Sequence, residues 1–478
     1  MSVERPDVPS RPWRLRFHER RPLLALGDFL AASISLVLAL YAWSLGERFL
    51  GFSVEFVQRR VPWWFWFMPL IWLLLLIELY DLHRASRWRA TVKGVATAAG
   101  IGFVVYLILF FYYANSPRSL LPRRGVATFL IAATLLTLAW RWFYIRIFTL
   151  PQFMRRALIV GGGNAGTLMI EVYKAISPPP FVLVGVVDDD PEKQGKSILG
   201  IPVLGTSETL LKLVKEHEIS DIIVAISGAL NSNMFQALLT AQESGVEIIR
   251  MPKMYERLLG RVPIRILEAD WILRSFVDET SVSVFDELLK RLFDILGGIV
   301  GMAIFLATFP FIALAIVIDD GLPIFYTQIR LGRMARPYPL IKYRTMRRDA
   351  ESDGKPRWAQ ENDRRATRVG RFLRKSHLDE LPQFINVLRG EMSLVGPRAE
   401  RLELVEYFEK RVPFYRARLL VKPGLTGWAQ VNYGYAASIE ETTVKLEYDL
   451  YYIKNRSLLI DILILLRTPS TVLGLKGR

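Results

Sequence analysis

Four long apolar runs occupy the first third of the chain, at 23–45, 61–82, 94–113 and 126–148. Each has the roughly 20 residues that a helix needs to cross the hydrocarbon core of a bilayer. Aromatic side chains lie mostly near the ends of the runs, as is typical of a membrane interface; they are Trp63, Trp64, Trp66, Tyr112, Tyr113, Trp140 and Trp142. The pattern predicts four transmembrane helices within residues 22–149.

Lysine and arginine residues are divided unequally between the two sides of these runs. Fourteen lie in the N-terminal arm at 1–21, in the loop after the second run and in the stretch 141–156 at the end of the fourth run and beyond it, whereas the other two loops hold six. Cytoplasmic loops carry the excess of positive residues. We therefore expect the arm, and everything after the fourth run, to be cytoplasmic.

The pattern changes at residues 150–255, where short apolar runs alternate with helical periodicity. The runs lie at 157–160, 182–188, 201–204, 221–226 and 246–251. This alternation predicts a doubly wound, mainly parallel α/β domain of the Rossmann-like kind.

A glycine motif follows the first of these strands. Gly161, Gly163 and Gly166 form GxGxxG, and Asp188 ends the next strand 22 residues after the last glycine. The spacing fits a dinucleotide fingerprint, with NAD or another nucleotide as ligand. The alternative, which we favour because the motif alone is weak evidence, is a scaffold whose glycines serve only a tight turn and close packing. We expect such a domain to act in regulation or assembly.

A connector at 256–285 leads to a fifth apolar run, at 295–318, with basic residues on both flanks. The positive flanks suit a segment that enters and leaves the membrane on the same face, and Pro310 removes a helix hydrogen bond and can create the bend. The run predicts a re-entrant helix at about 291–319. A kinked helix that spans the membrane is the alternative.

Composition agrees with a membrane protein that has basic aqueous parts. The chain has 478 residues, of which 51% are hydrophobic, and its 62 lysines and arginines against 46 acids give a formal charge of +16. Without a recognisable nucleic-acid motif, this charge indicates anionic lipids and phosphate-bearing substrates as partners. The absence of cysteine excludes disulfides and thiolate metal sites.

The candidate chemistry lies between Arg374 and Arg398, in RKSHLDELPQFINVLRGEMSLVGPR. Asp379 and Glu380 are adjacent at the predicted start of a short helix, with Lys342 and Arg344 upstream. A carboxylate can attack phosphorus or bind Mg2+, and cations can neutralise phosphate oxygens. The alternative is that the two acids only cap the helix and complement its dipole.

Five motifs in the last 190 or so residues, in order and in register, resemble the bacterial sugar transferases, also called polyprenyl-phosphate hexose-1-phosphate transferases or monotopic phosphoglycosyl transferases. They are HLDELPQFINVLRGEMSLVGPR, KRLFDI from Lys290, IKYRTM around Lys342, KPGLTGWAQV from Lys422 and YDLYYIKNRSLLIDI from Tyr448. The resemblance implies a mainly α, or α+β, catalytic domain at 286–478 with the re-entrant helix. The family often has serine before the bend proline and proline after the arginine of GPR, where this chain has Phe309 and Ala399.

The resemblance also implies a two-step reaction. Asp379 would attack the β-phosphorus of a UDP-sugar and release UMP, and polyprenyl (undecaprenyl) phosphate would then capture the phosphosugar. Glu380 would bind Mg2+, and further roles fall to phosphate-binding Lys342, Arg344, Arg374 and Arg398, to Asp461 as an acid near the site, and to Thr426 and Gln430 in a nucleotide-sugar loop. We expect a homodimer in a bacterial inner membrane, with membrane lipids as further partners and the sugar left open.

Two other functions compete with this one. An NAD-dependent sugar-nucleotide dehydratase would need a Tyr-x-x-x-Lys pair on a helix, and Tyr338 with Lys342 is the only such spacing. Pro337 and Pro339 make a helix there unfavourable. A non-catalytic scaffold of an export system is the third interpretation, and it would tolerate Asp379→Asn.

Overall fold

The computed structural model describes residues 17–46, 51–80, 85–113, 122–148, 154–228, 230–266, 283–347, 365–434 and 438–472. The chain forms two compact units, Met1–Met254 and Tyr255–Arg478. Most of the predicted N-terminal arm and much of the predicted connector lie outside the described residues. The first part of that connector, including Val262 and Ile264, packs into the core of the second unit.

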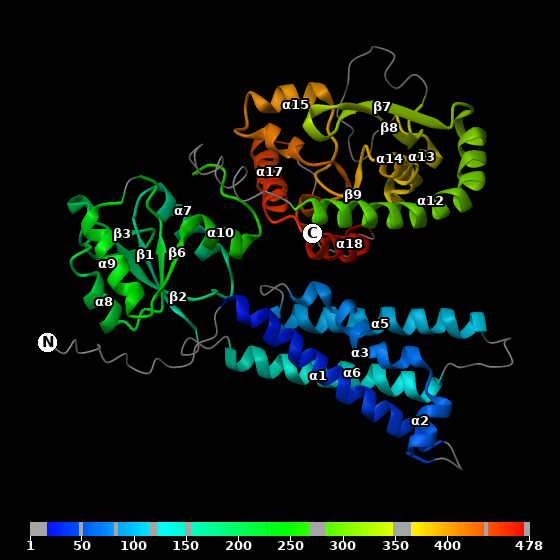
Figure 1. The fold of residues 1–478 in the computed structure, drawn as a ribbon, viewed down its shortest axis with the longest axis horizontal. Coiled ribbons are helices and arrows are strands. Elements are labelled where there is room, and N and C mark those ends of the chain that lie inside the picture. The colour runs from blue at the N-terminus through cyan, green and yellow to red at the C-terminus, as the bar shows by residue number, and fades with distance from the viewer. Residues whose placement is uncertain are drawn as a thin grey trace. The chain divides into compact units, whose positions relative to one another are not determined.

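Three of the four predicted membrane helices are present as long helices: α1 (Phe17–Ser44), α5 (Trp88–Tyr113) and α6 (Arg123–Phe148) (Figure 1). Each is long and apolar enough to cross a membrane. Arg141 of α6 and Asp28 of α1 form a fully buried ion pair at 2.7 Å. Intramembrane charges of this kind are tolerated where they pair inside a bundle.

The second predicted helix, at 61–82, differs from the expectation. After the short helix α2 (Val54–Arg60), the chain forms a 3-10 turn η1 (Trp63–Phe67), a helix α3 (Met68–Leu75) and a second 3-10 turn η2 (Ile77–Tyr80). Pro62 precedes the first turn and Pro69 lies in the first turn of α3. Proline fits such starting positions but cannot donate a hydrogen bond from inside a helix, so each proline begins a new segment.

The middle domain contains a six-stranded sheet in the order β3-β4-β2-β1-β5-β6. The five predicted strands are confirmed as β1 (Arg156–Val160), β2 (Val182–Val187), β4 (Ile201–Gly205), β5 (Asp221–Val224) and β6 (Glu247–Arg250), all paired in parallel, and the unpredicted β3 (Ser197–Ile198) pairs antiparallel with β4. The main helices are α7 (Asn164–Ala175), α8 (Leu210–Glu216) and α9 (Ser232–Glu243). Because the chain builds outward from β1 in both directions, the sheet is doubly wound as predicted.

The second unit is mostly helical, and α10 (Met251–Leu259) leads into it. Its elements in chain order are α12 (Val284–Asp320), β7 (Phe325–Leu331), η6 (Arg333–Ala335), β8 (Pro337–Tyr343), α13 (Arg368–Ser376), η7 (Leu378–Gln383), α14 (Phe384–Arg389), β9 (Ser393–Val395), α15 (Leu402–Glu409), η8 (Tyr415–Leu420), β10 (Gly424–Thr426), α16 (Trp428–Asn432), α17 (Ile439–Lys454) and α18 (Leu458–Val472). Strands β7 and β8 form an antiparallel hairpin, and β9 pairs in parallel with β10. Helix α18 places Ile464 in the core, so this apolar segment packs against the globule.

The long helix α12 bends between two arms (Figure 1), and Pro310 lies inside it. The hydroxyl of Thr308, two residues before the proline, donates to the carbonyl oxygen of Ile304 at 2.8 Å. Directly before the proline, the ring of Phe309 stacks on Phe325 of β7, which in turn stacks on Tyr343 of β8. Apolar residues after the proline pack into the same cluster. The arm beyond the bend is therefore packed against the hairpin.

The first arm of α12 approaches the globule closely through glycines. A Cβ atom at Gly301 would lie 2.2 Å from the ring of Phe384, and one at Gly297 would lie 2.4 Å from Leu394. Both distances are far below van der Waals contact, so a side chain at either position would displace the Phe384 or Leu394 side chain, or push α12 away from α14 and β9.

Candidate active site

The two candidate catalytic carboxylates lie in the 3-10 turn η7, directly after α13. His377 ends α13 in the left-handed conformation, at φ 56°, and redirects the chain. The turn that follows presents Asp379 and Glu380, and Pro382 lies near its end. This local geometry confirms that the pair lies at the start of a short helical segment.

Glu380 is held by two cations. Its Oε1 atom accepts from Lys342 Nζ at 2.7 Å and from an Arg398 guanidinium nitrogen at 3.0 Å. Lys342 comes from β8, whereas Arg398 comes from the loop after β9. Burial raises the pKa of Glu380, but Lys342 and Arg398 outweigh it and hold that pKa well below its usual range. Glu380 is therefore an anion at neutral pH.

The pKa of Asp379 is shifted in the opposite direction, upward. Its side chain is buried, and this burial raises its pKa; Lys342 opposes the rise and the neighbouring Glu380 adds to it. Two adjacent carboxyl groups whose environments push their pKa values apart are a signature of divided catalytic roles.

A cavity of about 780 Å³ adjoins Glu380, while Asp379 is not among the residues that line it. Its volume lies in the range of about 300–1,000 Å³ that is typical of small-molecule sites. Glu380, Arg398, Thr426 and Gln430 all line it. The Thr426 hydroxyl lies 2.9 Å from that of Thr468, and the Gln430 side-chain amide donates to the Leu425 carbonyl. The structure thus brings the predicted loop to the same cavity as the carboxylate and the arginine.

The glycines of GLTG serve close packing in this loop. A Cβ atom at Gly424 would lie 2.1 Å from the backbone nitrogen of Gly396, and one at Gly427 would lie 2.2 Å from the Gly396 oxygen. These contacts join β10 to the segment that carries Arg398 and explain the motif structurally.

Three other predicted site residues do not contact Glu380. Arg344 donates to the carbonyl oxygens of Asp320 and Gly321 at the end of α12. Arg374 lies in the last turn of α13, where its side chain makes no hydrogen bond or ion pair with the described residues. Asp461 is buried and binds Lys290 Nζ at 2.7 Å and the Tyr452 hydroxyl at 2.8 Å.

The network around Asp461 fixes the strand that precedes Arg398. Lys290 and Tyr452 both donate to the carbonyl oxygen of Val395, at 3.2 and 3.1 Å. Asp294 accepts from the Ser393 hydroxyl and from the Leu394 backbone. Lys290 and Asp294 lie one turn apart in KRLFDI, and residues at this spacing share a helix face. This spacing could have predicted from the sequence that the two side chains act together.

A second network supports Arg398 itself and was missed. Arg418 is almost fully buried and donates to Asp449 at 3.0 Å, to the Tyr415 hydroxyl at 2.8 Å and to the Arg398 carbonyl at 3.0 Å. Burial raises the pKa of nearby Glu400, but Lys445 and Arg418 outweigh it and lower that pKa to about 2. The sequence gives no spacing that links these residues.

The glycine motif of the middle domain is formed as predicted. Gly161 has a φ of 101°, and a Cβ atom at Gly166 would lie 2.0 Å from the Gly161 oxygen, while Gly163 precedes the first turn of α7. Asp188 accepts from the Gly162 backbone at 2.6 Å and from Lys193 at 3.1 Å. The acid is thus bound by groups of its own chain, and the glycines have clear packing roles.

Comparison with known proteins shows the family of the chain. Residues 285–475 match the family described as bacterial sugar transferase. The chain is 30% identical over 316 residues to UDP-glucose:undecaprenyl-phosphate glucose-1-phosphate transferase of Escherichia coli, which covers 66% of this chain and 67% of that relative. The chain belongs to the bacterial sugar transferase family. Residues 75–252 of this family member also match a CoA-binding domain.

The names of two further relatives specify N-acetylgalactosamine in one case and glucose in the other. UDP-N-acetylgalactosamine-undecaprenyl-phosphate N-acetylgalactosaminephosphotransferase of Aeromonas hydrophila is 39% identical over 228 residues, which is 48% of this chain. UDP-glucose:undecaprenyl-phosphate glucose-1-phosphate transferase of Xanthomonas campestris is 32% identical over 288 residues, or 58% of this chain. The matched stretches span 52% and 58% of the length of these two relatives.

Proposed function

We propose that this sugar transferase moves a hexose 1-phosphate from a UDP-sugar to undecaprenyl phosphate and so begins the assembly of a capsule, exopolysaccharide or O-antigen unit. The observation that carries the proposal is the Asp379–Glu380 pair, with opposed pKa shifts, next to Lys342 and Arg398. The names of the relatives support both substrates.

The side chains of this site suit two successive nucleophilic displacements at the β-phosphorus of the UDP-sugar. A carboxylate oxygen of Asp379 attacks the β-phosphorus, and the bond from that phosphorus to the bridging oxygen breaks, so UMP leaves with the electron pair. An oxygen of undecaprenyl phosphate then attacks the same phosphorus and releases the Asp379 carboxylate. Lys342 and Arg398 neutralise phosphate oxygens during both steps, which is the main protein contribution to phosphoryl transfer.

Glu380 can also hold Mg2+. The described residues contain no group of three or more acidic or histidine side chains placed to hold a metal ion, but Mg2+ in phosphate-transfer sites usually takes one or two carboxylates plus substrate phosphates and waters. Both cations contact Oε1 of Glu380, which leaves Oε2 available as a ligand. A bound Mg2+ would supply positive charge at the diphosphate.

The test is UMP release by the purified full-length protein from a panel of UDP-sugars that includes glucose and N-acetylgalactosamine. We expect release from at least one sugar, dependent on Mg2+ and undecaprenyl phosphate for turnover. Folded protein that releases no UMP from any of them would leave the scaffold interpretation in its place.

The fall in rate on the acid side of the pH–rate profile, its acid limb, should report the ionisation of Asp379. An aspartate attacks only when ionised, and because burial raises its pKa above the usual value of about 3.9, kcat/KM should fall at a higher pH than for an exposed aspartate. Lys342 lowers this pKa, so Lys342→Gln should move the limb to still higher pH, whereas Lys410→Gln, at an exposed position, should not. An acid limb that stays in place in Lys342→Gln would contradict Asp379 as the titrating group.

We further propose that α12 is re-entrant, in a bacterial inner membrane with the catalytic domain in the cytoplasm. The bend between its arms, with Pro310 inside the helix, supports this topology. The chain contains no cysteine, so Asp286→Cys and Leu322→Cys, at exposed positions in the first turn of the helix and just after its end, give single labels. A membrane-impermeant maleimide should modify both from the cytoplasmic side only. Modification of the two from opposite sides would show a spanning helix.

A further inference from the structure

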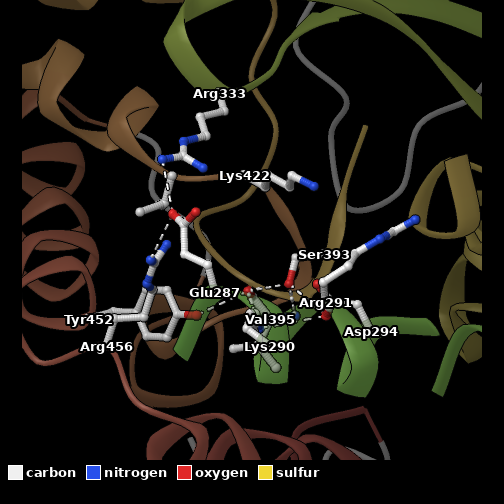
Figure 2. A pocket seen from close by; sticks show the side chains of 11 residues that line it. Glu287, Lys290, Arg291, Asp294, Arg333, Ser393, Val395, Lys422, Tyr452 and Arg456 are labelled. Atoms are coloured by element: carbon white, nitrogen blue, oxygen red, sulfur yellow. Dashed lines mark hydrogen bonds and ion pairs between the residues drawn. The ribbon is translucent and has the colours of Figure 1, made fainter. Parts of the chain in front are cut away.

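A second pocket, separate from the catalytic cavity, lies at the first arm of α12 (Figure 2). Its volume is about 170 Å³, and it shares no lining residue with the 780 Å³ cavity. We call it the cationic pocket; its lining residues are Glu287, Lys290, Arg291, Asp294, Arg333, Ser393, Val395, Val421, Lys422, Tyr452 and Arg456.

Positive charge exceeds negative charge in this pocket. Five of the lining residues are cationic and two are carboxylates. Glu287 pairs with both Arg333, at 3.1 Å, and Arg456, at 3.5 Å. Lys290 pairs with Asp461, and even when this additional acid is counted, five cations face three carboxylates.

Arg291 forms no ion pair with the described residues but donates to the carbonyl oxygens of Val387 and Leu388. Lys422 is the one cation lining this pocket that has no polar partner among the described residues. Its ammonium makes no hydrogen bond or ion pair with the described residues, and no dashed line reaches it in Figure 2. Its side chain is half-buried. Burial, together with the nearby guanidinium groups of Arg291 and Arg333, lowers the pKa of Lys422. An anion placed among these three groups would remove the repulsion between them.

The size of the pocket limits the anion. Sites for drug-sized ligands and nucleotides usually have about 300–1,000 Å³, and 170 Å³ suits a single tetrahedral group. Arginine and lysine together are the usual partners of phosphate, the first as a fork of donors and the second as a point charge. The Leu288 and Leu292 side chains, on the same arm of α12, are largely exposed and apolar, so the pocket lies beside an exposed apolar surface of the kind that suits lipid.

We propose that the cationic pocket binds one phosphate group, carried by an anionic lipid headgroup or free in solution, with Lys422 and Arg333 as its principal contacts. Because the pocket joins α12 to the η6 turn and to the segment before β10, a bound phosphate strengthens the attachment of the membrane arm to the globule. The proposal concerns binding alone and does not depend on the catalytic activity.

The experiment measures the rate at which a water-soluble acylating reagent modifies Lys422 in the full-length protein, by mass spectrometry, with exposed Lys410 as internal reference. In phosphate-free detergent, inorganic phosphate should slow modification of Lys422 by about tenfold once it exceeds its Kd about tenfold, as mass action requires. Chloride at equal ionic strength should not. Vesicles of phosphatidylcholine with phosphatidylglycerol are compared with phosphatidylcholine alone.

Arg333→Gln should raise the phosphate concentration needed for half-protection by about tenfold, because one charge-assisted hydrogen bond is lost. Arg416→Gln is the matched control, since Arg416 also forms a single exposed pair, with Glu409 at 2.9 Å, away from the pocket. Protection by inorganic phosphate supports recognition of phosphate whatever its carrier, and protection by phosphatidylglycerol alone assigns the site to lipid. Equal Lys422 modification under all these conditions overturns the proposal.

Discussion

Asp379→Asn should reduce UMP release by about 1,000-fold or more, in line with losses seen when a catalytic nucleophile is removed. Asparagine preserves the size of the side chain but has no carboxylate to attack phosphorus. The substitution also removes no ion pair, because the two cations contact Glu380 and not Asp379. The fall should therefore come from chemistry and not from unfolding.

A covalent intermediate gives this prediction a second readout. Wild-type protein incubated with a UDP-sugar in the absence of undecaprenyl phosphate should carry a phosphosugar on the peptide that contains Asp379, detectable by mass spectrometry. Glu406→Gln, which removes an exposed carboxylate on α15, should behave as wild type. Activity in Asp379→Asn within tenfold of wild type, or a phosphosugar on another residue, would rule out the proposed nucleophile.

Arg418→Met should destabilise the catalytic unit by about 3–5 kcal/mol, the cost of leaving a buried charge without its partner. Asp449 is almost fully buried, and its own burial raises its pKa while Arg418 opposes the rise. For a unit of this size the loss corresponds to a fall of about 10 °C in the unfolding temperature, measured by intrinsic fluorescence. Because Arg418 also holds the Arg398 carbonyl, activity should fall at temperatures where the protein remains folded.

The double variant Arg418→Met with Asp449→Leu separates the lost pair from lost packing. Replacing both members of a buried pair by apolar residues is often close to neutral, so most of the stability should return. Arg416→Met, at the exposed pair with Glu409, should change the unfolding temperature little. A double variant no more stable than Arg418→Met alone would show that the ion pair is not the cause.

The pattern of apolar residues correctly predicted the strands and helices that consist of one continuous apolar run. The five parallel strands are confirmed because each is a short apolar run buried in a sheet, and the three long membrane helices because no proline interrupts their apolar runs. The two-residue strand β3 was missed because Ser197 and Ile198 carry no alternating pattern. The second membrane segment was misread because its many apolar residues outweigh Pro62 and Pro69 in a hydropathy average, whereas both prolines start new segments.

The candidate site was predictable from the sequence where several of its residues come from one motif. Asp379, Glu380 and Arg398 come from a single stretch, and the structure brings Glu380 and Arg398 into contact. Arg344 was grouped with Lys342 by proximity, but residues two apart on a strand share a face only while the strand continues, and β8 ends at Tyr343. The contacts of Arg418 join segments far apart in the chain, so no local spacing could reveal them.

The glycines of α12 have a consequence for how such proteins diversify. Because Gly297 and Gly301 lie against Leu394 and Phe384, the anchor is shaped to one particular globule and is not an interchangeable tether. A chimera that takes its anchor from an unrelated membrane protein must also import α14 and β9, or else lose the approach that orients the Arg398 loop. We therefore expect exchange of the anchor alone to impair the protein more than exchange of the anchor together with α14 and β9.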